Sequence, residues 1–249
     1  MAGHSKWANI KHRKARQDAV KGKAWSKCSR AIIAAARGGG GDPDSNLTLR
    51  YAIEEAKAAN MPKDTIEKAV KKGSGELKDG ESFEEVRYEG YGSAGIALIV
   101  DCLTDNVNRT APEMRMIFEK AGGKMAKPGS VSFGFSPKGI ILVESSKATE
   151  EQLMETALEA GADDIVDAGG AWEITCAPSD TLAIRDALVA AGIEPESAEM
   201  SMIPANTVDC DVAIAGKVLR LVDALEDHDD VQKVYHNGDI SEEVMAELD

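Results

Sequence analysis

Apolar residues in the first 75 positions recur at the spacing of an α-helix. Three such stripes predict three helices: residues 24–37, a segment whose stripe runs from Leu49 to Ala59, and residues 62–73. Their expected boundaries hold suitable residues: Gly38–Gly41 after the first, Asp44 or Ser45 as cap of the second, Pro62 as first residue and Gly73 as end of the third. The first twenty residues lack such a stripe and are expected to lie extended or loosely helical on the surface.

The pattern changes to short strands and helices after the linker-like residues 73–80. The first elements expected are an edge strand over 84–91, a strand over 96–102, a helix opened by a capping box at Thr110–Glu113, a short strand near 123–125, and a half-buried strand through Val131, Phe133 and Phe135. Phe133 and Phe135 could stack on bases as in RNA-recognition modules, but we expect them to form the buried face of their strand.

A second series follows the βαββαβ order of a ferredoxin-like unit. Its expected elements are a strand over 139–143, a helix after the capping box Thr149–Gln152, strands over 164–167 and 172–176 around a Gly169–Gly170 turn, a helix capped by Ser179, and a strand over 198–202. A helix over 208–225 and a strand over 231–235 are left over, and they would complete the first series.

The fold class predicted is therefore α+β, with an N-terminal three-helix domain followed by two ferredoxin-like α/β domains, one inserted in the other. The expected domains are a basic helical domain over 1–75, an acidic ferredoxin-like domain over 80–136 plus 205–240, and an inserted ferredoxin-like domain over 138–204. A linear arrangement, with the last helix and strand packed elsewhere, is the alternative.

Charge divides the chain in the same place as this pattern. Residues 1–75 hold 16 Lys/Arg against 7 Asp/Glu, a net charge of +9. Because the whole chain has a net charge of −14, residues 76–249 carry −23. A domain this basic on an acidic chain is typical of a protein that binds a polyanion, and the acidic part should repel nucleic acid. The residues expected to contact phosphates or bases are Lys6, Trp7, Lys11, His12, Arg13, Lys14, Arg16, Lys21, Lys23, Lys27 and Arg30.

Other candidate sites are weaker. Asn106, Asn108 and Arg109 follow a strand and open a helix, which makes them a candidate secondary contact for an anion. Residues 226–230 are acidic but consecutive, so we expect a solvated turn and no metal site. Neither a nucleophile elbow nor a phosphate-binding glycine loop is found, so we expect no catalytic residues, no enzymatic activity and no cofactor.

Cysteine use and hydropathy place the chain in a cellular context. Cys28, Cys102, Cys176 and Cys210 are far apart, so we expect reduced thiols, with neither a disulfide frame nor a zinc site. No apolar run approaches the roughly 18 residues of a membrane span. The expectation is a cytoplasmic protein without a membrane partner. For its oligomeric state, which the sequence does not fix, a monomer is the default.

Six motifs occur in order: GHSKWANIKHRKARQD, AAARGGGGDP, AAN-MPKDTIEKAVKKG, YEGYG, LTDNVNRT and GSVSF. Together they closely resemble the YebC/PmpR family, over nearly the whole chain. The family includes bacterial proteins described as probable transcriptional regulators and a mitochondrial translational activator of cytochrome oxidase. The resemblance implies a bacterial cytoplasmic member without a transit peptide, with a helical N-terminal domain, two α/β domains and no enzymatic activity.

The function expected is that of a non-enzymatic, nucleic-acid-binding regulator of gene expression. The resemblance leaves two roles open: transcription regulation by DNA binding, or a translation factor associated with RNA and the ribosome. We find no base-reading set on the basic helix, which favours RNA or the ribosome. The alternative is a protein-interaction adaptor whose acidic α/β domains bind a basic partner.

Overall fold

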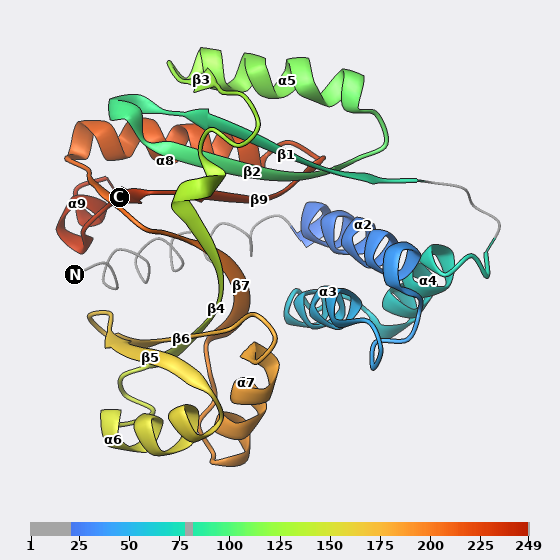
Figure 1. Cartoon of the computed structure of the whole chain (residues 1–249), viewed down its shortest axis with the longest axis vertical. Helices are drawn as coiled ribbons and strands as arrows, with labels where there is room; N and C mark the ends of the chain where they lie inside the picture. Colours follow the sequence, from blue (N-terminus) through green and yellow to red (C-terminus); the bar gives the residue numbers. More distant parts are fainter. Residues whose placement is uncertain (1–20, 78–81, 249) are drawn as a thin grey trace. The chain divides into compact units, whose positions relative to one another are not determined.

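A computed structural model describes residues 21–77 and 82–248 (Figure 1). Among these residues the chain divides into two compact units. One contains the residues up to Val131 together with 217–236, and the other contains residues 132–216 and 237–248. No helix in the described part of the chain is both long and apolar enough to cross a membrane.

The N-terminal helices of the first unit are α2 (Lys21–Gly39), α3 (Leu47–Ala58) and α4 (Lys63–Gly73), close to the ranges predicted. Their small aliphatic core is centred on Ile32 and Leu49, which are fully buried. Gly73 lies against the backbone of Ile33, where a Cβ would come within 2.6 Å of the carbonyl oxygen. The predicted cap of α3 is wrong by one or two residues, because Asn46 accepts the hydrogen bond from Leu49 N at 3.1 Å.

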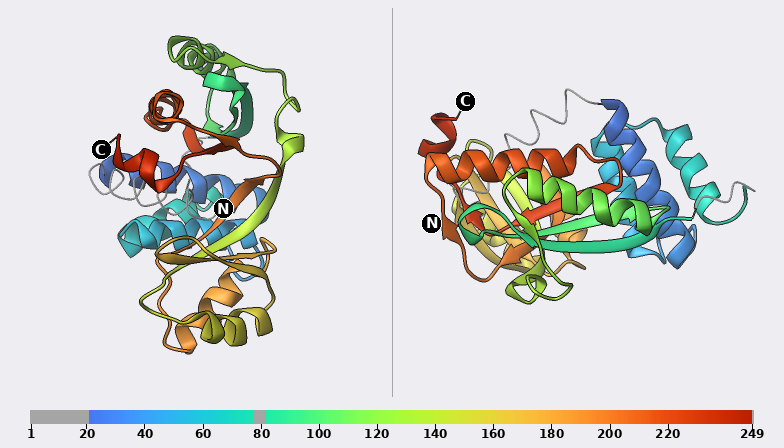
Figure 2. Two further views of the ribbon diagram at one scale, coloured as in Figure 1. Left: turned by 90° about the vertical axis from the view of Figure 1, so that its left-hand side faces the viewer. Right: turned by 90° about the horizontal axis from the view of Figure 1, so that it is seen from above.

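The first sheet contains β1 (Glu84–Tyr91), β2 (Ala97–Thr104), β3 (Lys124–Met125) and β9 (Val231–His236) in the order β3-β1-β2-β9, with antiparallel pairing throughout. Helices α5 (Val107–Lys120) and α8 (Val212–Glu226) lie on one face of it (Figures 1 and 2). The prediction of β1 as an edge strand is wrong, because β1 pairs on both sides. In the sheet it lies between β3 and β2.

The second sheet contains β4 (Phe135–Glu144), β5 (Ala162–Asp167), β6 (Ala171–Cys176) and β7 (Ser197–Pro204) in the ferredoxin-like order β5-β6-β4-β7. Its helices are α6 (Glu150–Leu153), continued by a π-helical turn over Met154–Leu158, and α7 (Thr181–Ala190). The capping box at Thr149 and Gln152 is confirmed. Ser179 is not a cap: Asp180 takes that position and its side chain makes no capping bond.

The order of elements makes one ferredoxin-like unit an insertion in the other, as predicted. β4 to β7 lie in the sequence between β3 and α8, both of which belong to the first series. The remaining short elements are β8 (Val208–Asp209), β10 (Gly238–Asp239), which pairs with β8, and α9 (Glu242–Ala246). The helix predicted over 208–225 is α8, which starts at Val212, four residues later than predicted.

The segment from Val131 to Phe135 differs from its prediction as a half-buried strand. Val131 is buried in a loop, and Ser132–Gly134 form a single 3-10 turn. Phe135 is buried at the start of β4, whereas the side chain of Phe133 is 86% exposed. Alternation of polar and apolar residues indicated a strand here, but the two phenylalanines do not share a face.

Burial controls the chemistry of the four thiols. Desolvation raises the pKa of Cys102 to about 12 and that of Cys28 and Cys210 to about 11, and it also raises the pKa of Cys176. At pH 8 nearly all Cys102 side chains are then thiols, whereas the thiolate is the form that reacts. We expect a disulfide reagent to label native protein far more slowly than urea-unfolded protein. Fast reaction of all four native cysteines, measured by absorbance, would contradict this expectation.

Candidate nucleic-acid interface

The predicted contact residues fall into two groups. Lys6, Trp7, Lys11, His12, Arg13, Lys14 and Arg16 lie outside the described residues. Lys21 begins α2, and Lys23, Lys27 and Arg30 follow on the same helix at spacings of four and three residues, which places them along one face. The structure therefore describes the surroundings of Lys23, Lys27 and Arg30.

Lys23, Lys27 and Arg30 face the acidic turn that ends α8. Lys23 Nζ donates to the carbonyl oxygen of Asp227 at 3.2 Å, and Lys27 Nζ donates to that of Glu226 at 2.6 Å. Arg30 Nη1 donates to the carbonyl oxygen of Asp229 at 2.7 Å. Carbonyls at a helix C-terminus carry partial negative charge, so they are natural partners for three cations.

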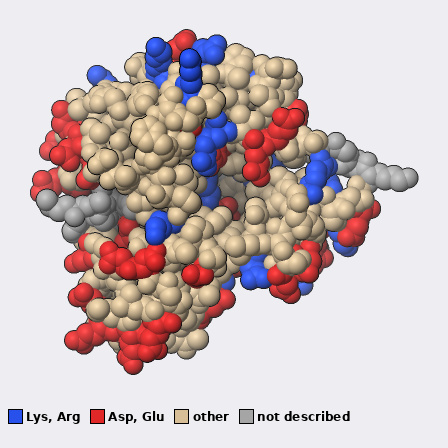
Figure 3. Space-filling view, viewed as in Figure 1, with Lys and Arg blue, Asp and Glu red and all other residues tan. Residues whose placement is uncertain are grey.

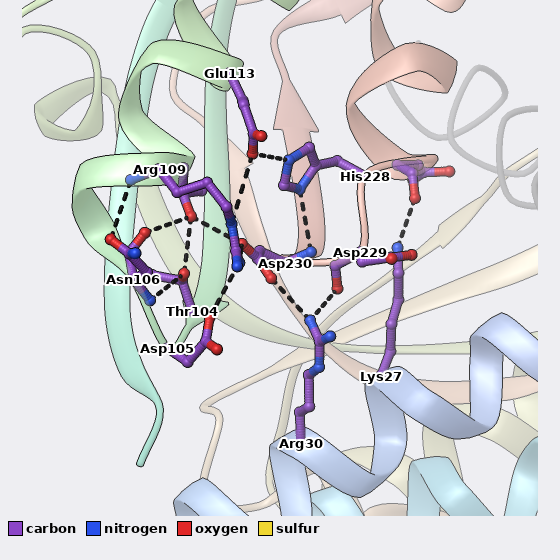
Figure 4. A network of polar contacts seen from close by, with 12 residues as sticks. Lys27, Arg30, Thr104, Asp105, Asn106, Arg109, Glu113, His228, Asp229 and Asp230 are labelled. Atoms are coloured by element: carbon purple, nitrogen blue, oxygen red, sulfur yellow. Dashed lines mark hydrogen bonds and ion pairs between the residues drawn. The ribbon is translucent and has the colours of Figure 1, made fainter. Parts of the chain in front are cut away.

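The carboxylate of Asp230 is the centre of a larger network (Figure 4). Its Oδ1 accepts from Arg30 Nη1 at 2.9 Å, and its Oδ2 accepts from Arg109 Nη2 at 2.7 Å and from the Thr110 hydroxyl at 2.8 Å. The Asp230 side chain is only 3% exposed, whereas Arg30 and Arg109 are 24% and 45% exposed. Asp230 thereby links α2, α5 and the turn before β9. The expectation of a solvated acidic turn is wrong for this residue.

The start of α5 explains why this carboxylate is held there. The Asn106 side chain caps the helix by accepting from Arg109 N at 3.2 Å, and Thr104 Oγ1 accepts from Asn106 N at 2.9 Å. The predicted capping box at Thr110 is wrong, because Thr110 lies inside the helix and its hydroxyl points to Asp230. Arg109, one of the three residues expected to contact an anion here, donates to the chain's own Asp230 carboxylate. Asn108, the remaining candidate of this group, is exposed.

A histidine extends the network toward solvent. His228 Nδ1 accepts from the backbone N–H of Asp230 at 3.1 Å, so in the neutral ring the proton is on Nε2. Nε2 then donates to Glu113 Oε2 at 2.9 Å. Both contacts fix the turn that presents Asp230. Among residues 21–77 and 82–248, no group of three or more His, Cys, Asp or Glu side chains is arranged to hold a metal ion.

Two pKa shifts follow from this geometry. Burial lowers the pKa of the Lys27 ammonium, and the nearby charge of Glu226 opposes that shift. Burial alone would raise the pKa of Asp230, but hydrogen bonds from Arg109 and Thr110 outweigh it and hold that pKa below its ordinary value. Asp230 is therefore ionised at neutral pH, and its charge offsets part of the positive charge of Arg30 and Arg109.

Two aromatic residues support the same helix. Trp25 packs against the helical core and its Nε1 donates to the carbonyl oxygen of Ala59 at 2.9 Å. The Arg30 guanidinium lies 5.6 Å from the ring centre of Phe83. Asp230 and Phe83 were missed by sequence reasoning, because no local pattern links them to α2, some 50 to 200 residues away.

Comparison with known proteins assigns the chain to a family. The family model described as "TACO1/YebC protein N-terminal domain" matches residues 5–76, and the model "TACO1/YebC second and third domain" matches residues 83–238. The chain belongs to the TACO1/YebC family. This confirms the resemblance drawn from the six motifs.

Relatives in the TACO1/YebC family match over the full chain. A probable transcriptional regulatory protein of Methylococcus capsulatus is 55% identical over 249 residues, covering all of both chains. Another from Rubrobacter xylanophilus is 51% identical over 248 residues, covering all of this chain and 99% of its own. A crystal structure of a conserved hypothetical protein from Aquifex aeolicus is 45% identical, with a TM-score of 0.78 over 90% of this chain and 92% of its own.

Proposed function

We propose that this TACO1/YebC family member is a non-enzymatic regulator of gene expression that binds nucleic acid through its basic N-terminal segment. The observation that carries the proposal is the composition of residues 3–16, which hold five Lys/Arg, one tryptophan and no acid on a chain of net charge −14. Such a segment releases counterions when it meets phosphates. The names of the relatives, probable transcriptional regulatory proteins, support the regulatory role.

The network around Asp230 refines which cations take part. Lys23, Lys27 and Arg30 already donate to groups of the chain itself, so fewer of their N–H donors are left for a phosphate. We therefore assign the main phosphate contacts to the segment before α2, at Lys6, Lys11, Arg13, Lys14 and Arg16. In this proposal Trp7 adds a stacking contact with a base.

A salt titration tests this assignment. For five to eight phosphate contacts we expect log affinity to fall with log salt at a slope of about −4 to −7. Replacing Lys11, Arg13, Lys14 and Arg16 with Gln should reduce the magnitude of that slope by about 3 and weaken binding about 300-fold at 0.15 M salt. Fluorescence anisotropy with labelled RNA and DNA of 30 nucleotides measures both quantities.

A matched variant controls for total charge. Lys57, Lys63, Lys138 and Lys147 each lie within 4 Å of an acidic side chain, and replacing these four with Gln removes the same charge. We expect that variant to bind like the wild type. Equal losses in the two variants would show that only net charge matters, and full binding by the first would overturn the assignment.

A second measurement separates transcription from translation. We favour RNA and the ribosome over duplex DNA, because Lys23, Lys27 and Arg30 face the chain's own carbonyls and, among the side chains that the structure describes on α2, we find no base-reading set. We expect the wild-type protein to sediment with ribosomes from a lysate. We expect the variant with Gln at positions 11, 13, 14 and 16 to lose this association. Retention on chromosomal DNA and not on ribosomes would instead favour transcriptional control.

An adaptor function is the second candidate. It is favoured by the second sheet and its helices, where every Lys and Arg between residues 138 and 204 is paired with an acidic side chain: Lys138 with Asp163, Lys147 with Glu196 and Arg185 with Asp186. Acidic residues far outnumber these three cations in the same stretch, and acidic side chains are visible over α6 in Figure 3. This excess of negative charge suits a basic partner. If the wild-type protein binds no nucleic acid, the adaptor function is the candidate that remains.

A further inference from the structure

A lysine cluster interrupts the acidic part of the chain. Residues 120–138 contain Lys120, Lys124, Lys127 and Lys138 and no Asp or Glu, although residues 76–249 carry a net charge of −23. Lys138 is paired with Asp163. The other three are exposed, and within the described residues none of them forms an ion pair. We call Lys120, Lys124 and Lys127 the second basic cluster.

The fold brings the three lysines of the second basic cluster to one end of the first sheet. Lys120 is the last residue of α5, and Gly122, with a φ of 75°, turns the chain into the two-residue edge strand β3, where Lys124 lies. Lys127 opens a turn in which Ser130 N donates to its carbonyl oxygen at 3.1 Å. Figure 3 shows Lys and Arg side chains gathered over α5 and β3.

A partly exposed aromatic side chain lies beside these lysines. Tyr91 is directly opposite Lys124 in the register of β1 with β3, and the residue is 39% exposed. The Tyr91 hydroxyl donates to the carbonyl oxygen of Ser130 at 3.1 Å, which ties the ring to the turn after Lys127. An aromatic ring among cations is the arrangement that binds single-stranded nucleic acid, with phosphates on the cations and a base on the ring.

A buried carboxylate holds the lysine-bearing loop in place. Glu89 is 3% exposed, and its two carboxylate oxygens accept from Gly129 N at 2.8 Å and from Val131 N at 2.5 Å. Its carbonyl oxygen accepts from Ala126 N at 2.7 Å. The loop is thus bonded to β1 on both sides of Lys127, and a preorganised loop loses less conformational entropy on binding.

Helix stabilisation does not account for the second basic cluster. A cation in the last turn of a helix offsets the helix dipole, and Lys120 fits that role. Lys124 and Lys127 lie beyond the helix and cannot act in this way. Repulsion among three lysines without acidic partners lowers stability slightly, so their placement at one end of the sheet points to a ligand.

We propose that Lys120, Lys124, Lys127 and Tyr91 form a second contact for single-stranded nucleic acid, in which the lysines bind phosphates and Tyr91 stacks on one base. This inference rests on the proposed function, and it adds a site on the part of the chain whose net charge would otherwise repel nucleic acid. It makes the protein a two-site binder.

Charge removal tests the site in the full chain. Replacing Lys120, Lys124 and Lys127 with Gln should reduce the salt slope by about 2 for a labelled 30-nucleotide oligouridylate and weaken binding about 50-fold at 0.15 M salt. Replacing Lys138, Lys147 and Arg185 with Gln removes the same charge from paired positions and should leave affinity within twofold. Identical behaviour of the two variants overturns the proposal.

The ring of Tyr91 provides an independent test. Tyr91→Leu should weaken oligouridylate binding about tenfold, whereas Tyr91→Phe, which keeps the ring and loses the bond to Ser130, should remain within twofold. Equal losses would show that the hydroxyl acts structurally, and would overturn the stacking role.

The outcomes also separate this inference from the proposed function. Loss of binding in the N-terminal variant, with none in the Lys120, Lys124 and Lys127 variant, overturns the second site and leaves the function standing. A wild-type chain that binds no nucleic acid overturns both. If the triple lysine variant loses binding to poly-glutamate but keeps the wild-type affinity for oligouridylate, the surface would be assigned to an acidic protein instead.

Discussion

Asp230→Ala should lower the free energy of unfolding by about 3 kcal/mol. The substitution leaves the buried Thr110 hydroxyl without its carboxylate partner and removes the shared acceptor of Arg30 and Arg109. Because both guanidinium groups are partly exposed, water recovers some of the loss, and the effect stays below that of a fully buried ion pair. Urea denaturation followed by circular dichroism measures it.

Asp230→Asn is the control for Asp230→Ala, because it removes the charge of the side chain while keeping its shape. It keeps the side-chain volume and one acceptor oxygen, so we expect a smaller loss at pH 7. Since the folded-state pKa of Asp230 is depressed, the stability from its ionised form is fully present above the unfolded value of about 4 and disappears as the pH falls through the folded value. The stability difference between wild type and Asp230→Asn should therefore shrink below pH 4. A difference that is constant from pH 7 to pH 2 would contradict the assignment.

Gly139→Ala should destabilise the second unit by about 3 kcal/mol, at the upper end of what overpacking costs. A Cβ at this position would lie 1.9 Å from Thr181 Oγ1 and 2.6 Å from Cys176 Sγ. Thr181 and Cys176 are fully buried, and β4 is held by pairing on both sides at this point. Neither neighbour can move aside without breaking the contact between α7 and the sheet.

Gly134→Ala is the matched control for Gly139→Ala. A Cβ at Gly134 meets no atom within 4 Å, and its φ is not in the left-handed region, so we expect a change within about 0.5 kcal/mol. Thermal unfolding of both variants compares them. A melting temperature unchanged in Gly139→Ala would show that α7 can shift away from β4.

The parts of the fold that could be predicted are those with local signals. Helical stripes located α2, α3 and α4, and the capping box at Thr149 located the start of α6. Positive φ at Gly169 and Gly170 agrees with the turn expected between β5 and β6. In each case the residues that determine the element lie within a few positions of one another.

The errors arose where distant residues decide the structure. β1 contains four charged residues among its eight, typical of an edge strand, yet Glu89 is buried because a loop 40 residues away donates to its carboxylate. Thr110 had the spacing of a cap, but its partner is Asp230, 120 positions later. Composition identified the cations of α2 as part of the candidate interface. The carbonyl and carboxylate groups of residues 226–230 that they contact could not be predicted from the sequence.

The insertion has a consequence for how the chain folds during synthesis. Strand β2 completes its sheet only with β9, which follows about 130 residues later, after the whole of β4 to β7 has been made. Long-range pairing of this kind is slow, and an uncovered strand edge favours aggregation. The strands of the second sheet are contiguous in sequence, so this sheet can form before β9 has been synthesised and has paired with β2. We therefore expect chains that end before Val231 to keep an ordered second sheet and to aggregate through the open edge of β2.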